Sequence, residues 1–109
     1  MGRENLILIL VKDVESRLKG KHFSSLKDLV IACMKEAKDH WLVTDTDEQF
    51  RGSLGAALLL ANAEQKCQLE IEIECLQALV TGNLGHFDLP EDFEPIGLIP
   101  LWREIKETK

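Results

Sequence analysis

The sequence lacks any apolar run long enough to cross a membrane. The stretch at residues 6–11 is far below the ~20 residues that a membrane-spanning helix needs, and Lys12 and Asp13 follow it directly. It also lacks the basic flank and the small-residue cleavage site of a signal peptide. We therefore expect a cytoplasmic or nuclear protein that is not secreted and does not contact membranes.

Cysteines are few and odd in number. The three are Cys33, Cys67 and Cys75, and their spacing is not that of a disulfide-rich secreted scaffold. On a shared helix, the Cα atoms of Cys67 and Cys75 would lie about 12 Å apart, which is beyond disulfide reach. We expect reduced, buried thiols, as in an intracellular protein.

Motifs for catalysis and for metal binding are also missing. The three histidines are isolated, and none has a Cys or His partner at the spacing of a zinc site. The acidic turn at residues 45–49 fails as a calcium loop, because Phe50 stands where Gly is required and Ala56 where Glu is required. Gly52 and Gly55 lack the Lys-Ser/Thr of a phosphate-binding loop. We therefore assign no catalytic residue, no metal ligand and no cofactor. Carboxylates occur in pairs, at Glu70/Glu74, Asp45/Asp47 and Glu91/Asp92, but nothing in the sequence predicts that any of these is buried.

The charge is acidic overall and unevenly distributed. The net charge is −6. Residues 1–43 carry eight Lys/Arg and six Asp/Glu, whereas residues 44–109 carry five Lys/Arg and thirteen Asp/Glu. Proteins that bind nucleic acids gain affinity largely by neutralising phosphates with basic side chains. Nucleic acid is therefore not expected as a partner.

Helical periodicity dominates the apolar pattern. Apolar residues recur at intervals of three and four, and turn-forming residues separate the periodic segments. The sequence predicts helices at residues 4–19, 25–41, 48–64, 68–80 and 101–107. Glycines at 52 and 55 would cost about 1 kcal/mol each inside a helix, and part of that cost returns if another helix approaches closely there.

The predicted fold is all-α, either a four- to five-helix bundle or a set of stacked helical hairpins. Residues 1–82 are expected to form the helical core. Residues 83–109 contain all three prolines, and they are expected to form a connector and a short C-terminal helix that packs on the same domain.

One alternative stays open. The Leu/Ile run at residues 6–11 and the strict alternation of apolar and acidic side chains at residues 69–75 also fit short β-strands. In that case the fold would be α+β.

Two local resemblances point to helical scaffold proteins. Residues 89–101 contain Leu-Pro-Glu-Asp, four residues, Gly, two residues and Pro-Leu. This segment, 13 of 109 residues, resembles one in the helical-repeat scaffold proteins of nonsense-mediated mRNA decay. Residues 75–79 and the helix predicted after Ser25 are similar to the N-terminal helical domain of large Arf exchange factors. Neither resemblance transfers a functional residue.

The function we expect is that of a non-enzymatic helical protein–protein interaction or regulatory module, with self-association as one form of that interaction. Leu6, Leu8 and Ile9 lie off the apolar stripe of the first helix, so that helix is apolar nearly all round at its start. Phe93 and Trp102 are large aromatic side chains in the C-terminal segment. These five are the candidate partner-binding residues, toward a protein partner or a second copy. The alternative is a small helical ligand-binding or catalytic domain whose pocket the sequence does not reveal.

Overall fold

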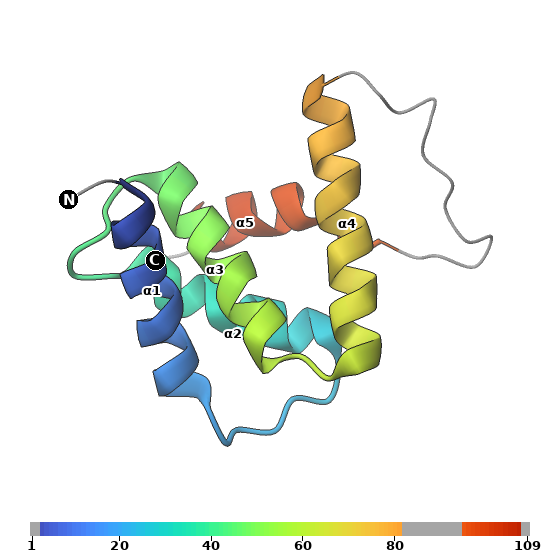
Figure 1. Ribbon diagram of the computed structural model, residues 1–109, viewed down its shortest axis with the longest axis horizontal. Coiled ribbons are helices and arrows are strands. Elements are labelled where there is room, and N and C mark those ends of the chain that lie inside the picture. The colour runs from blue at the N-terminus through green and yellow to red at the C-terminus, as the bar shows by residue number, and fades with distance from the viewer. Residues whose placement is uncertain (1–2, 82–94, 108–109) are drawn as a thin grey trace.

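The computed structural model describes residues 3–81 and 95–107, and every regular element within them is an α-helix (Figure 1). The helices are α1 (Arg3–Leu18), α2 (Leu26–Lys38), α3 (Thr46–Leu60), α4 (Ala63–Thr81) and α5 (Leu98–Glu107). The all-α prediction is confirmed. The α+β alternative is wrong, since residues 6–11 lie within α1 and residues 69–75 within α4.

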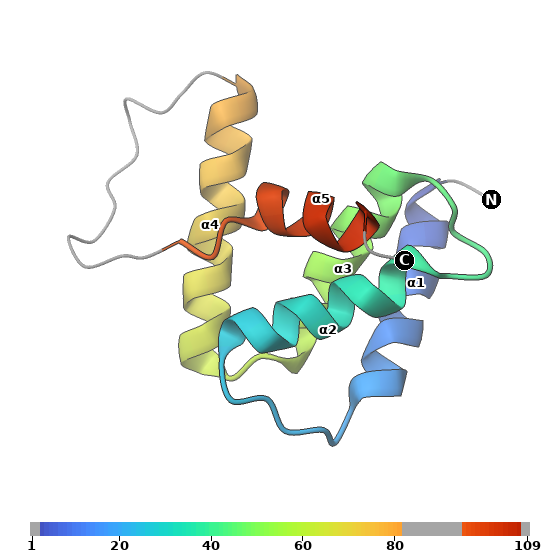
Figure 2. The same cartoon turned by 180° about the vertical axis from the view of Figure 1, so that it is seen from behind.

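The first three helices form the centre of the bundle. α3 packs against both α1 and α2, and most of the buried core comes from these three helices. Seen from behind, α5 lies along α2, and α4 stands across the ends of both (Figure 2). None of the helices in the described ranges has the length and apolar character that a bilayer crossing requires.

The contact between α1 and α3 depends on two glycines of α3. A Cβ atom at Gly52 would lie 2.8 Å from Leu10 Cγ, and one at Gly55 would lie 2.9 Å from Val11 Cγ2. Both separations are too short for real carbon atoms, and Leu10 is completely buried. The glycines therefore let α1 approach α3 closely, and the packing gained offsets their poor helix propensity.

Side chains cap the starts of three helices. Ser25 Oγ accepts a backbone N–H from the first turn of α2, and Asp45 does the same for α3. In front of α4, Asn62 and Gln65 exchange two hydrogen bonds, each from a backbone N–H to the other's side-chain oxygen, at 3.1 and 2.9 Å. These caps satisfy amide groups that have no partner within their own helix.

Several predicted helix boundaries move. The helix predicted over residues 48–64 ends earlier, at Leu60, and α4 begins at Ala63, so the break falls at the Asn62 cap. The last helix begins at Leu98 and includes Pro100 in its first turn. Pro is tolerated there, because a first-turn N–H has no partner within the helix in any case.

A buried carboxylate holds the start of α5. Glu72 of α4 is only 4% exposed, and its Oε1 accepts N–H groups from Ile96 at 2.7 Å and from Gly97 at 3.3 Å. Its other oxygen, Oε2, is buried and has no hydrogen-bond partner among the described residues. Burial raises the pKa of Glu72 above its usual 4.5, against the two N–H donors, which lower it. Glu72 is not one of the paired carboxylates considered from the sequence, and its burial has no signal in the local pattern.

Two lysines hold the other end of α5. Lys38 Nζ donates to the carbonyl oxygen of Ile105 at 3.2 Å, which provides a partner for a C-terminal carbonyl of the helix. Lys106 Nζ donates to Gln49 Oε1 of α3 at 2.9 Å. α5 is thus joined by polar contacts to α2, α3 and α4, in addition to its buried apolar face.

Gly52→Ala should destabilise the fold by about 1–3 kcal/mol, as overpacked cores do, although Ala is by itself the better helix former. The added methyl group would collide with Leu10. Urea unfolding would measure the loss. In a Leu10→Ala background the same change should cost little or should stabilise, and an undiminished cost there would show that the contact with Leu10 is not the cause.

Glu72→Gln should stabilise the protein at pH 8 and have less effect near pH 4. The folded-state pKa of Glu72 lies above the unfolded value of 4.5, so the native state binds this proton more tightly. Its contribution to stability is therefore complete below pH 4.5 and is lost as the pH rises through the folded pKa.

The measurement is the free energy of unfolding from pH 4 to 8, taken as the difference between variant and wild type. Glu70→Gln, an exposed carboxylate on the same helix, serves as the control and should leave the profile nearly unchanged. A Glu72→Gln difference that does not grow with pH would contradict the assignment.

Candidate interaction surface

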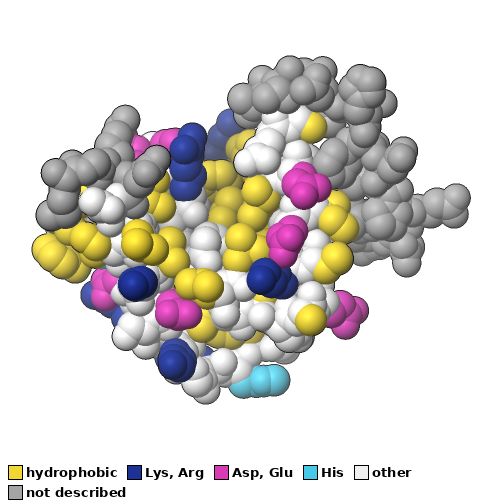
Figure 3. All heavy atoms as spheres, in the orientation of Figure 1, with side chains coloured by type: hydrophobic (Ala, Val, Ile, Leu, Met, Phe, Trp, Pro, Cys, Tyr) yellow, Lys and Arg dark blue, Asp and Glu magenta, His cyan; other side chains and the backbone are white. Residues whose placement is uncertain are grey.

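Three large apolar side chains are exposed on α1 and on the loop that runs beside it. Leu8 of α1 is 51% exposed, and Trp41 and Leu42 in the loop between α2 and α3 are 71% and 38% exposed. The loop runs beside α1 at the edge of Figure 1, and hydrophobic side chains gather along the same edge in Figure 3. We refer to Leu8, Trp41 and Leu42 together as the Trp41 surface.

His40 fixes the conformation of this loop. Its Nδ1 accepts the backbone N–H groups of Leu42 at 3.2 Å and of Val43 at 3.0 Å. Nδ1 is therefore the unprotonated nitrogen, and the proton on Nε2 is donated to Asp13 Oδ2 of α1 at 2.9 Å. The imidazole, only 1% exposed, thus links α1 to the turn that carries Trp41.

Charged and amide side chains extend the support on both sides of His40. Arg17 reaches Asp13 at 3.4 Å and Glu36 of α2 at 3.3 Å. Gln49 of α3 donates to the carbonyl oxygen of Val43 at 2.9 Å, and the Val43 side chain is buried. Both backbone groups of this residue are therefore held, one by His40 and one by Gln49.

The indole of Trp41 has a defined position despite its exposure. Its ring stacks on the buried imidazole of His40, with 5.6 Å between the ring centroids. One indole face is thus supported from below while most of the side chain faces solvent. A large apolar group presented on a fixed backbone loses little conformational entropy when it is covered.

The structure separates the three candidate residues of α1. Leu8 is exposed, whereas Leu6 and Ile9 are only half-buried, and Leu6 packs against the core. The all-round apolar start of the helix is therefore divided between a face that packs inward and a face that stays open.

Of the two aromatic candidates, Phe93 lies outside the described residues. Trp102 is half-buried on α5, where its ring centroid lies 5.7 Å from that of Phe50 and Lys106 Nζ lies 5.5 Å from the indole. The contact between the Phe50 and Trp102 rings attaches α5 to α3.

Sequence reasoning missed Trp41 and Leu42. Trp41 follows Ala37 by four residues, so it was expected on the buried stripe of the second helix. That helix instead ends at Lys38. The helix-start residues from Thr44 onward were the available signal, since they leave little room for a longer helix.

The described cysteines and acids do not assemble a reactive centre. Burial, assisted by the Glu36 carboxylate, raises the pKa of the Cys33 thiol to about 12, so this thiol stays protonated at neutral pH. Cys67 is exposed, contrary to expectation, and Cys75 is half-buried. Among the described residues, no group of three or more His, Cys, Asp or Glu is placed to hold a metal ion.

Comparison with known proteins identifies no relative. No family model matches the chain, and no curated protein or solved structure shows a significant match to it. Its function has to be inferred from the geometry of the chain itself.

His40→Ala should destabilise the fold by about 2–4 kcal/mol, because two backbone N–H groups and Asp13 lose their partner. Urea unfolding and amide hydrogen exchange at Val43 would measure the effect. His40→Asn should recover part of the loss, since an Asn oxygen two or three residues before an N–H accepts it in Asx turns. The exposed His22→Ala should change stability by less than about 0.5 kcal/mol. Equal losses for both histidines would refute the role of His40.

Proposed function

We propose that this chain is a non-enzymatic helical protein–protein interaction module, and that it self-associates through the Trp41 surface. The proposal rests on one observation, an indole that is 71% exposed on a loop held by the His40 hydrogen bonds. The three free cysteines are compatible with a cytoplasmic or nuclear setting.

Residue type and preorganisation both support this reading. Trp is enriched among the residues that dominate binding energy at interfaces. Leu8 and Leu42 are also exposed, on α1 and on the loop that runs beside it, and clusters of exposed apolar side chains mark interaction sites more often than scattered single ones do. The net charge of −6 argues against nucleic acid as the partner.

The energetic balance of the loop points the same way. His40 and Val43, on either side of Trp41 and Leu42, are buried. Trp41 and Leu42 therefore face outward in a turn that several hydrogen bonds hold in place. A solvent-facing turn would be equally stable with polar side chains at both positions. A role in binding accounts for an exposed indole at this position, whereas the stability of the fold does not.

Trp41→Ala should weaken self-association at least about tenfold, as expected for loss of an interface Trp. Sedimentation equilibrium over a concentration series would measure it. Because Trp41 is mostly exposed, its removal should leave the helical circular dichroism and the unfolding free energy nearly unchanged.

Ile99→Ala is the matched control, because this α5 side chain is also exposed, at 40%, and lies outside the Trp41 surface. It should leave the association constant unchanged, and Leu8→Glu should reduce it. A chain that stays monomeric at all concentrations, or equal effects of Trp41→Ala and Ile99→Ala, would refute the proposal.

A further inference from the structure

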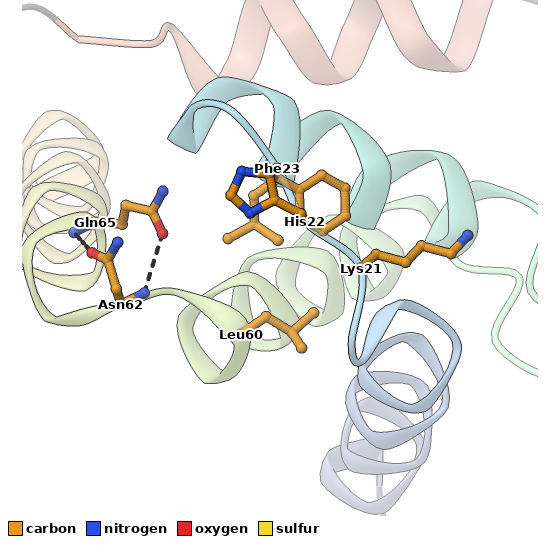
Figure 4. Close-up of a pocket in the computed structure, with 7 residues that line it drawn as sticks. Lys21, His22, Phe23, Leu60, Asn62 and Gln65 are labelled. Carbon is orange, nitrogen blue, oxygen red and sulfur yellow. Dashed lines mark hydrogen bonds between the residues drawn. The ribbon is translucent and has the colours of Figure 1, made fainter.

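A second surface feature lies far from the Trp41 loop. It is a hollow of about 200 Å³ between the α1–α2 loop and the α3–α4 connection. The side chains of Phe23 and Leu60 line its apolar part (Figure 4). The Asn62 amide lies at the end nearest α4, and Lys21 lies at the other. We refer to this feature as the Phe23 hollow.

The size of the hollow suits one aromatic side chain. A cavity of about 150 Å³ lined by apolar side chains holds benzene, so a hollow of about 200 Å³ has room for a bicyclic indole. It is smaller than the ~300–1,000 Å³ of typical small-molecule sites. Phe23 offers a ring for an aromatic contact, and the polar side chains of His22, Asn62 and Gln65 make up most of the remaining lining.

Trp41 cannot reach the hollow of its own chain. The Trp41 loop leads into the start of α3, whereas Leu60 of the hollow is the last residue of α3. A helix of 15 residues is about 22 Å long. The Trp41 loop and the α3–α4 connection thus lie at opposite ends of α3 (Figure 1).

The charges around the two features are opposite. Residues 39–47, which include the Trp41 loop, carry three acidic and no basic side chains, and one of them, Asp47, pairs with Arg51 of α3 at 3.1 Å. Residues 19–27, which lead through Lys21 and Phe23 of the hollow, carry three basic and no acidic side chains, and Asp28 follows them. Two copies of the chain that bring these segments together gain electrostatic attraction, whereas a contact between two Trp41 loops would set acid against acid.

We propose that Trp41 of one copy inserts into the Phe23 hollow of a second copy. This inference rests on the proposed function and specifies how the self-association occurs. The contact joins two different surface patches. A dimer held by one such contact is heterologous, because it keeps a free hollow on one copy and a free indole on the other, and association continues to a ring or an open chain.

The decisive experiment mixes two variants. Trp41→Ala removes the indole but keeps the hollow. Leu60→Trp fills the hollow with the chain's own side chain but keeps Trp41. Each variant alone should self-associate at least about tenfold more weakly than wild type. An equimolar mixture should form a complex of two chains, with near wild-type affinity, and should stop there in sedimentation velocity.

Charge reversal tests the hollow without altering its apolar part. Lys21→Glu should weaken self-association and reduce its dependence on salt. Arg103→Glu, at an exposed cation of α5, should not. This pair keeps the inference falsifiable if Leu60→Trp fails to fold, which circular dichroism would show.

The outcomes separate the two proposals. If Trp41→Ala abolishes association while Leu60→Trp and Lys21→Glu leave it unchanged, the interaction surface stands and the hollow is not its counterpart. If both single variants are weak and their mixture is equally weak, the indole of one copy does not enter the hollow of another and this inference is wrong. If Trp41→Ala has no effect, both proposals are wrong.

Discussion

The close approach of α1 to α3 is the constraint on which the rest of the structure depends. Because Gly52 and Gly55 have no Cβ atom, Leu10 and Val11 sit directly against the backbone of α3. This depth places Asp13, one turn further along α1, where His40 can reach it. A bulkier α3 surface would move α1 outward and break that contact. The apolar packing of two helices thereby determines a polar contact on which a surface loop depends.

The His40 contacts explain how an exposed indole and a buried valine coexist in one short loop. Buried polar groups must be paired, and the imidazole, with one acceptor and one donor nitrogen, serves α1 and the loop at once. Once both N–H groups are bound to Nδ1, the backbone direction is fixed. Val43 then points into the core, and Trp41 is directed to solvent against the imidazole face.

Periodicity predicted most of the fold because each helix buries a continuous apolar stripe. The errors arose where a long-range contact overrides the local pattern. In the sequence, Trp41 continues the apolar stripe of α2, yet α2 ends at Lys38. The loop after it is held by a hydrogen bond between His40 and Asp13, which are 27 positions apart. In the sequence, nothing distinguishes Glu72 from the other glutamates of the alternating segment at residues 69–75. Only the placement of Ile96 and Gly97, 24 and 25 positions away, makes its burial possible. The Phe23 hollow is also not visible in the sequence, because it lies between the α1–α2 loop and the α3–α4 connection, which are distant along the chain.

The charge asymmetry between the Trp41 loop and the Phe23 hollow follows partly from helix capping. Asp45 is the N-cap of α3, and Asp47 and Glu48 lie in its first turn, where negative charge is stabilised by the helix dipole. Arg17, in the last turn of α1, is favoured for the opposite reason. Asp45 and Asp47, which stabilise the start of α3, therefore also place negative charge beside the Trp41 loop. Helix capping already favours these charges. An interface that uses them needs few further residues beyond an outward-facing indole and a hollow that binds it.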